Sequence, residues 1–358
     1  MRPNELMQRL SLQHPIIQAP MAGGIDTPLL VSTVGERGGI GFIGAAYLSP
    51  DRLSSAVAEV RSLTERPFGV NLFGPVFRPG LPADIGRAIA AVTPAYASLG
   101  LQDPTGPGVP DDLFDARLEV ALNSGATALS FILSPPTDTA VDETRRRGMT
   151  LIGTATTVAE GRHLEELGVD AVVAQGAEAG GHRGTFAADV SLSLVGTMAL
   201  VPQMVDALEI PVIAAGGIMD GRGIAAALAL GAQAVQMGTV FLATEESGAD
   251  ATYTRSVLAA ADGDPVVTTV FTGKPARAIR NRFIVEIEDA GEAAVLPFPY
   301  QGELTGPIRS AAKRQHQAGY QAHWAGQGVG MARSLSTRDL MSRLVEETDE
   351  AIRRLSGR

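Results

Sequence analysis

Cysteine is absent from this chain of 358 residues, and its absence excludes several kinds of chemistry. Without a thiol the protein can form no disulfide framework, thiolate nucleophile, iron–sulfur cluster or thiolate zinc site. Histidine is scarce as well. There are five, and no two stand in a His-x-x-x-His or His-x-x-His pair. We therefore predict no metal site.

Basic residues are also in short supply. Lysine and arginine total 29 against 39 acidic residues, which gives a formal net charge of −10. A nucleic-acid-binding protein usually shows a basic stripe, so no nucleic-acid partner is expected. The start of the chain, MRPNELMQRLSLQHP, lacks the apolar region of a secretory signal. The longest apolar stretch, 224–243, contains two glutamines and two glycines, which favours a helix, a turn and a buried strand over a membrane span. We predict a cytoplasmic protein, while its oligomeric state is not readable.

Glycine, in contrast, is abundant: 41 residues exceed the usual ~7% and indicate many tight turns. Short apolar runs recur eight times, at 15–19, 40–43, 68–72, 128–133, 149–153, 171–174, 211–215 and 234–237. Helical patterns separate them at 27–36, 50–63, 81–92, 111–123, up to 147, 157–167, 192–208 and 221–230. The apolar runs are continuous, as expected for strands buried on both faces. Eight such strands predict an α/β fold of the TIM (β/α)8 barrel class.

The pattern changes after residue 262. A strand-like run at 265–271, a proline–aromatic turn at 296–300, the only tryptophan (Trp324) and an amphipathic helix at 336–355 follow. We predict a barrel over residues 1–262, with a helical excursion at 81–125, and a C-terminal capping segment over 263–358.

Two glycine-containing loops follow strands seven and eight, where barrels often bind phosphate. The first holds Gly216 and Gly217, and the second holds Gly238 and Thr239. Glycines let backbone amides approach an anion, and the threonine hydroxyl could add a donor. These loops predict a phosphate-bearing ligand; the alternative is that they are ordinary turns.

The loop after strand six is the most specific feature of the sequence. It reads QGAEAGGHRG over 175–184 and combines an amide, a carboxylate, a histidine and an arginine with four glycines. Its His182 suits a general base near neutral pH, whereas the alternative is a surface-loop histidine. Asn71 ends strand three as a candidate hydrogen-bonding partner for a ligand or as a satisfied buried amide. Gln18 and Met21 occupy the end of strand one in the same manner.

One motif is misleading. Residues 39–44, GIGFIG, match the G-x-G-x-x-G pattern of dinucleotide-binding proteins. That pattern requires a strand before it and a helix opening at its last glycine. Here the pattern is itself the strand, and the helix begins only near Pro50. We therefore reject a dinucleotide-binding fold.

Several segments in order resemble one family. PIIQAPMAGGIDTP, FGVNLF, VAQGAEAGGHRGTF, PVIAAGGI and AVQMGTVFLA are similar to the nitronate monooxygenases, formerly called 2-nitropropane dioxygenases. The pieces FTGKPARAIRNRF, LPFPYQ and WAGQG resemble the class I branch, and the resemblance spans about residues 12–345.

The resemblance implies a barrel that binds FMN and oxidises alkyl nitronates with O2 to a carbonyl compound plus nitrite or nitrate. Propionate 3-nitronate is the expected type of substrate, and detoxification the expected role. Matched by position, His182 is the catalytic base and Tyr300 faces the substrate. Together with the residues chosen above, the predicted cofactor site comprises Met21, Asn71, Gln175, Gly180, Gly181, Gly216, Gly217, Gln236, Met237, Gly238 and Thr239. One departure is Ile132, near which class I members often carry a histidine.

Other functions stay open. An FMN-dependent, NAD(P)H-using enoyl-acyl-carrier-protein reductase shares the AGGH-type loop, and a quinone reductase of similar type is a further alternative. A phosphate-ligand isomerase or nucleotide dehydrogenase would also use the barrel, although inosine-monophosphate dehydrogenase needs a cysteine that this chain lacks. A flavin-binding protein without catalysis is an alternative of another class.

Overall fold

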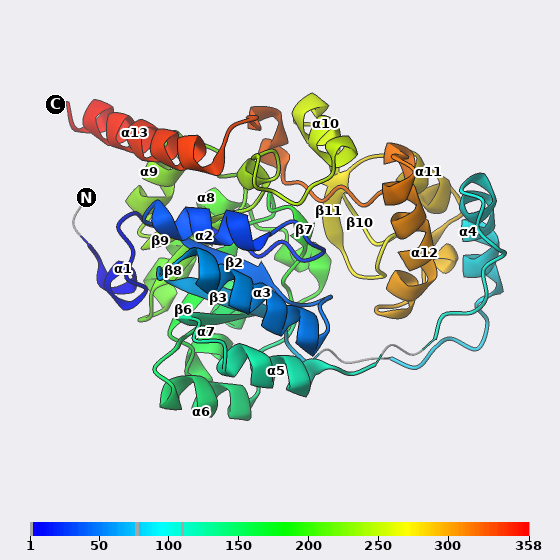
Figure 1. Ribbon diagram of the computed structural model, residues 1–358, viewed down its shortest axis with the longest axis horizontal. Helices are drawn as coiled ribbons and strands as arrows, with labels where there is room; N and C mark the ends of the chain where they lie inside the picture. The colour runs from blue at the N-terminus through cyan, green and yellow to red at the C-terminus, as the bar shows by residue number, and fades with distance from the viewer. Residues whose placement is uncertain (1–2, 76–78, 109–110, 358) are drawn as a thin grey trace.

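The computed structural model describes residues 3–75, 79–108 and 111–357 (Figure 1). Eight parallel strands form a closed barrel in the order β1-β2-β3-β4-β5-β6-β8-β9. Closure is shown by Ile17, which pairs with Ile40 of β2 on one side and Gln236 of β9 on the other. The predicted TIM barrel is therefore confirmed. The strands are β1 (Ile16–Gln18), β2 (Ile40–Gly44), β3 (Phe68–Phe73), β4 (Ala128–Ile132), β5 (Thr150–Ala155), β6 (Ala171–Gln175), β8 (Val212–Ala215) and β9 (Ala234–Met237).

The amino-terminal end of the barrel is plugged. Helix α1 (Glu5–Arg9), which the sequence patterns did not reveal, places Leu6 and Met7 in one apolar cluster with Ile17 and Ile40. The Asn4 side chain donates a hydrogen bond to the Gln233 carbonyl at 2.7 Å and anchors this helix. Only the carboxyl end of the barrel is thus left for a binding site.

An outer ring of helices packs on the strands. Several begin with a threonine, serine or aspartate whose side chain accepts a hydrogen bond from a backbone amide of the first turn. The predicted helix at 192–208 is broken, because Gly196 precedes a new helix. The ring contains α2 (Pro28–Glu36), α3 (Pro50–Leu63), α5 (Phe114–Leu122), α6 (Asp138–Arg146), α7 (Val158–Glu166), α8 (Thr197–Ala207) and α9 (Gly221–Ala229).

The final helix completes this ring. Helix α13 (Thr337–Ser356) packs between α9 and α2 and buries Leu340, Met341 and Leu344 in the main apolar cluster of the barrel (Figure 1). The sequence predicted the helix correctly but assigned it to the cap. Its position makes it the eighth helix of the barrel, and the cap is an insertion before it.

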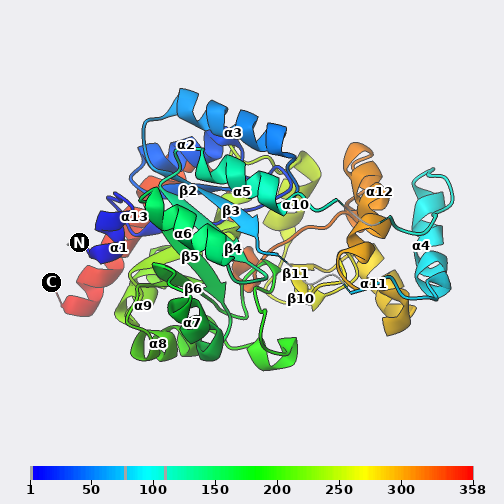
Figure 2. The same cartoon turned by 90° about the horizontal axis from the view of Figure 1, so that it is seen from below.

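The cap has its own apolar core, in which Phe271, Phe283 and Ile308 are buried. Helix α4 (Gly86–Ser98), which the sequence placed at 81–92 and with the barrel, packs on the cap helices at one end of the molecule (Figure 2). The predicted loop at 102–110 is irregular over 102–108, and 109–110 lie outside the described residues. The cap contains β10 (Pro265–Thr268), β11 (Ala276–Ile279), α11 (Arg282–Asp289), η3 (Glu292–Ala294), α12 (Tyr300–Arg314) and η4 (Ala318–Tyr320).

A short strand joins cap and barrel. Strand β7 (Gly181–His182), in the loop after β6, pairs antiparallel with β11, which in turn pairs with β10. In this sheet His182 lies opposite Ala276. Helix α10 (Ala251–Ala259) and η5 (Gln327–Met331) pack beside this junction. The cap therefore fixes the position of the loop that carries His182.

Candidate functional site

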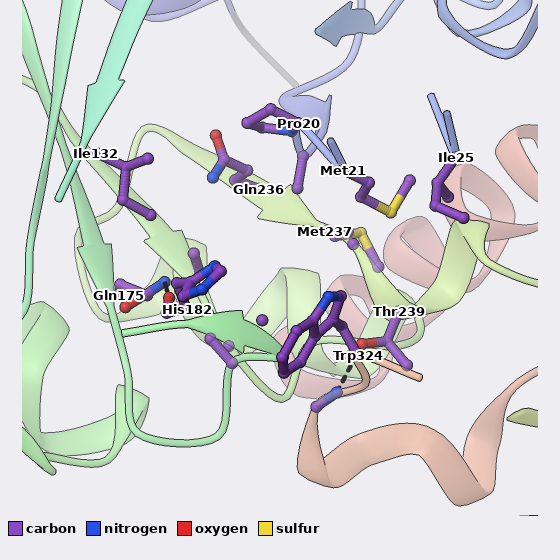
Figure 3. Close-up of a pocket in the computed structure, with 18 of the residues that line it drawn as sticks. Pro20, Met21, Ile25, Ile132, Gln175, His182, Gln236, Met237, Thr239 and Trp324 are labelled. Carbon is purple, nitrogen blue, oxygen red and sulfur yellow. Dashed lines mark hydrogen bonds between the residues drawn. The ribbon is translucent and has the colours of Figure 1, made fainter. Parts of the chain in front are cut away.

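A cavity lies at the carboxyl ends of the barrel strands, and Figure 3 shows the side chains around it. All eleven predicted cofactor residues line it, and so does His182. Tyr300 lies apart: it is 5% exposed and belongs to the apolar core of the cap. Gln18 is buried within the barrel, where its amide oxygen accepts from the Phe42 amide at 3.1 Å.

The loop that carries His182 is held by polar side chains. The Gln175 amide nitrogen donates to the His182 carbonyl at 3.0 Å, and its oxygen accepts from the Gly184 amide at 2.8 Å. The buried Arg183 donates to the Gly176 carbonyl at 2.6 Å. Arg277 of β11 donates to the carbonyl of Ala177, also in this loop, at 2.8 Å. Gln175 thus has a structural task besides its predicted contact with a cofactor.

Sequence reasoning missed a buried carboxylate below this loop. Glu160 of α7 is fully buried and accepts hydrogen bonds from the Thr156, Phe186 and Ala187 amides at 2.7–2.9 Å. The hydroxyl groups of Thr156 and Thr185 also donate to it. Burial alone would raise the pKa of Glu160, but these hydrogen bonds hold it below its usual range. The ionised carboxylate therefore joins the end of β5 to the loop after β7.

The hydrogen bonds of His182 define its free nitrogen. Its Nε2 lies 3.0 Å from the Thr272 hydroxyl oxygen, and that hydroxyl donates to the Lys274 carbonyl at 3.2 Å. With the single Thr272 proton directed to the Lys274 carbonyl, Nε2 is the protonated nitrogen and donor, and Nδ1 is the acceptor. The ring packs between Phe73 and Trp324, with ring centroids 5.8 and 5.5 Å away.

His182 is uncharged at neutral pH. Burial lowers its pKa to about 4, and the nearby Lys274 and Arg309 cations act in the same direction. A neutral imidazole with a free Nδ1 can accept a proton from a bound ligand.

The opposite side of the cavity suits an anion. Gly216 and Gly217 both adopt positive φ angles, 114° and 71°, which other residues rarely tolerate. The first amides of η2 (Thr239–Phe241) have no partner within that turn. The Thr239 hydroxyl oxygen accepts from the Gly326 amide at 2.9 Å, so its proton can be donated to a ligand. A Cβ at Gly180 would lie 2.6 Å from the Ala325 carbonyl carbon, so only glycine fits here.

Between these ends, side-chain amides and aromatic rings surround the space. The Asn71 amide nitrogen donates to the Ser130 hydroxyl at 2.9 Å, which leaves its oxygen available. Gln236 makes no side-chain hydrogen bond to any part of the chain that the structure describes, and Figure 3 shows it at the cavity. Ile132 presents an apolar side chain at the position of the departure on β4. These groups fit a flat heterocycle with polar edges and an attached phosphate.

Trp324 also lines the cavity, although the sequence marked it only as the single tryptophan of the chain. The Tyr253 hydroxyl donates to the Trp324 carbonyl at 2.6 Å, and His323 stacks on Tyr253 with centroids 4.5 Å apart. Tyr47 and Thr154 also line the cavity and were missed, because each is a single residue outside any motif.

Asp26 holds the loop after β1 against β2. Its Oδ2 accepts from the Met21 and Gly44 amides, both at 2.7 Å, and burial raises its pKa to about 7. A carboxyl group with a raised folded-state pKa contributes most stability below its unfolded pKa of ~3.9. This contribution to the free energy of unfolding is lost as pH rises through about 7.

We expect Asp26→Asn to remove this pH dependence of the free energy of unfolding. In urea unfolding, the free energy of unfolding of the variant should rise relative to that of the wild type between pH 4 and 7. A difference that stays constant over this range would contradict the raised pKa of Asp26.

The fold and the cavity define an α/β-barrel enzyme whose site, at the carboxyl ends of the strands, contains a half-buried, uncharged histidine. The chain belongs to the nitronate monooxygenase family, whose model, described as "Nitronate monooxygenase", matches residues 4–347. A probable nitronate monooxygenase of Bacillus subtilis (strain 168) is 42% identical over 349 residues, which cover 96% of this chain and 99% of the relative. One from Staphylococcus saprophyticus is 40% identical and covers 96% and 97%.

Solved structures agree with this assignment. A nitroalkane oxidase from Streptomyces ansochromogenes has a TM-score of 0.91 at 40% identity, covering 98% of this chain and all of the other. FabK from Thermotoga maritima has a TM-score of 0.79 at 29% identity and covers 100% and 99%. The protein is therefore an oxidoreductase, and its family implies a flavin cofactor. Among the described residues no helix is both long and apolar enough to span a membrane.

Proposed function

We propose that this protein is an FMN-dependent monooxygenase that oxidises alkyl nitronates of the propionate 3-nitronate type with O2. The products are a carbonyl compound and nitrite or nitrate, and the role is detoxification, in the cytoplasm. The observation that carries the proposal is the position of His182. It is a neutral, half-buried imidazole in the same cavity as every predicted cofactor residue, and its Nδ1 has no hydrogen-bond partner among the described residues.

The cofactor and the residues of the cavity would have separate roles in this reaction. FMN, when bound, supplies electron acceptance and the reaction with O2. Gly216, Gly217 and Thr239 would hold its phosphate, and Asn71 and Gln236 its polar ring edges. The His182 Nδ1 removes the α-proton of a neutral nitroalkane, whereas a nitronate arrives ionised and needs no base. Phe73 and Trp324 pack against the imidazole and limit the access of water.

The visible spectrum of the purified protein tests this proposal. We expect the peaks of oxidised flavin, released as FMN on denaturation, and their bleaching by a nitronate in the absence of O2. Readmission of O2 should restore the peaks and yield nitrite or nitrate. A colourless protein that cannot be reconstituted with FMN would overturn the proposal. A yellow protein whose flavin peaks are not bleached by a nitronate would instead be a flavin-binding protein without catalytic activity.

The NAD(P)H-using enoyl-acyl-carrier-protein reductase is the second candidate, because this chain carries the AGGH-type loop that such a reductase shares. Anaerobic mixing with NADPH separates the two. We expect the flavin spectrum to change little with NADPH and to bleach with a nitronate. Rapid bleaching by NADPH would favour the reductase.

A further inference from the structure

His182 and Thr272 are carried by neighbouring segments of the small sheet that joins cap and barrel. Strand β7, which contains His182, pairs with β11, and residues 269–275 connect β10 to β11. The strand pairing and a hydrogen bond from the Arg183 amide to the Pro275 carbonyl, 2.9 Å long, hold these segments together. The cap therefore places the hydroxyl of Thr272 beside an imidazole that belongs to a barrel loop.

The turn that contains Thr272 has a fixed shape. Gly273 has a φ of 78°, a backbone conformation that favours glycine. A Cβ at this position would lie 2.6 Å from the amide nitrogen of Phe298, so the turn packs closely against the segment before α12. Thr272 itself is 2% exposed, and its hydroxyl donates to the Lys274 carbonyl at 3.2 Å. A hydroxyl held in this way directs a lone pair, and not its proton, toward the imidazole.

The acceptor that faces the His182 ring is uncharged. In the part of the chain that the structure describes, the ring forms no salt bridge, and Thr272 is its hydrogen-bond partner. The charged groups that shift the pKa of His182 are two cations, Lys274 and Arg309, and both lower it. A carboxylate at Nε2 would stabilise the imidazolium and retain its proton. A hydroxyl orients the ring and leaves the base neutral.

We propose that Thr272 is a positioning residue for the base: its hydroxyl keeps the imidazole proton on Nε2, so that Nδ1 is free to accept. When Nδ1 takes the α-proton of a nitroalkane, the C–H electron pair moves into the nitro group, which becomes a nitronate. The imidazolium retains its Nε2–H bond to Thr272, and the new proton leaves from Nδ1 to water, which restores the same tautomer. The inference rests on the proposed function, and it makes the cap a part of the proton-transfer chemistry.

Thr272→Val removes the hydroxyl and keeps the shape of the side chain. For a neutral nitroalkane we expect kcat/KM to fall about 10- to 100-fold, because the imidazolium formed by proton abstraction loses a hydrogen bond. For the nitronate of the same compound kcat/KM should stay within about twofold of the wild type, since no base is needed. Thr272→Ser retains the hydroxyl and should restore nitroalkane activity to within about threefold. Thr269→Val is the matched control and should leave both activities unchanged, because the Thr269 side chain makes no hydrogen bond to the described part of the chain.

Nitrogen NMR of the histidine rings provides a second readout that needs no turnover. The ¹⁵N signals of His182, assigned by their loss in His182→Asn, distinguish the two neutral tautomers. We expect the Nε2–H tautomer in the wild type and in Thr272→Ser, and a mixture of tautomers in Thr272→Val. Either an Nδ1–H tautomer in the wild type or an unchanged tautomer in Thr272→Val would overturn the proposal.

Equal losses on nitroalkane and nitronate in Thr272→Val, at normal flavin content, would also overturn it, since the hydroxyl would then act on a step that both substrates share. If Thr272→Val does not fold, the wild type and Thr272→Ser still decide, because the proposal requires the Nε2–H tautomer and normal nitroalkane activity in both. If the wild type oxidises neither substrate, the proposed function itself fails, while the tautomer of His182 still tests the role of Thr272.

Discussion

Replacing His182 with asparagine should nearly abolish turnover of neutral nitroalkanes and leave much of the activity on preformed nitronates. The base is needed only to remove the α-proton, and general-base catalysis contributes about 10²- to 10⁴-fold. We expect kcat/KM for a neutral nitroalkane to fall by that factor. The measurement is steady-state O2 consumption at pH 7 with each form of the same compound.

The substitution leaves the charge at position 182 unchanged, because His182 has a pKa of about 4 and is already neutral at this pH. Asparagine therefore changes no charge beside the cofactor, and flavin content should match that of the wild type. That content, read from the visible spectrum, is the control. Equal losses on the nitroalkane and the nitronate would contradict the assignment of His182 as the base.

Among substitutions of the residues that hold the loops of the site in place, Glu160→Ala should be the most destabilising. It leaves the buried amides of Thr156, Phe186 and Ala187 without an acceptor. At about 1–3 kcal/mol for each of these three unpaired buried groups, the free energy of unfolding should fall by about 3–9 kcal/mol. Flavin occupancy should fall as well, because the loop after β6 loses its support.

Urea unfolding at pH 7 measures this effect, and Glu166→Ala supplies the control. Glu166 is exposed on the same helix, so its loss should change the free energy of unfolding by no more than about 0.5 kcal/mol. The lowered pKa of Glu160 also fixes the sign of the pH dependence. Its contribution is full above the ordinary carboxyl pKa and is lost as pH falls through the folded-state value. A loss below 1 kcal/mol at pH 7 would show that the loop does not depend on this carboxylate.

The barrel and most of its site could be predicted because their signals are local and repeated. Eight apolar runs separated by helical patterns determine the fold class. The barrel rule then places the strand ends together, which is why Gly217, Gly238, Asn71 and His182 meet in one cavity despite their separation in sequence. The GIGFIG segment was rightly read as a strand, β2, and not as a nucleotide loop.

The remaining features depend on contacts that leave no pattern in the chain. An amphipathic helix reveals that one face is buried but not its partner, so α13 was assigned to the cap and α4 to the barrel. Strand β7 has only two residues, too few for an alternating pattern. In the sequence, Glu160 cannot be distinguished from the exposed charged residues of a surface helix. Its role is shown only by the five hydrogen bonds that it accepts in the structure.

The position of α13 has a consequence for synthesis on the ribosome. The barrel wall between α9 and α2 is completed only by residues 337–356, after the whole cap has been translated. A nascent chain that already contains every strand of the barrel therefore still exposes the apolar surface that Leu340, Met341 and Leu344 later cover. We expect translation intermediates stalled before residue 337 to bind chaperones and to lack flavin, and cofactor loading to follow release of the finished chain.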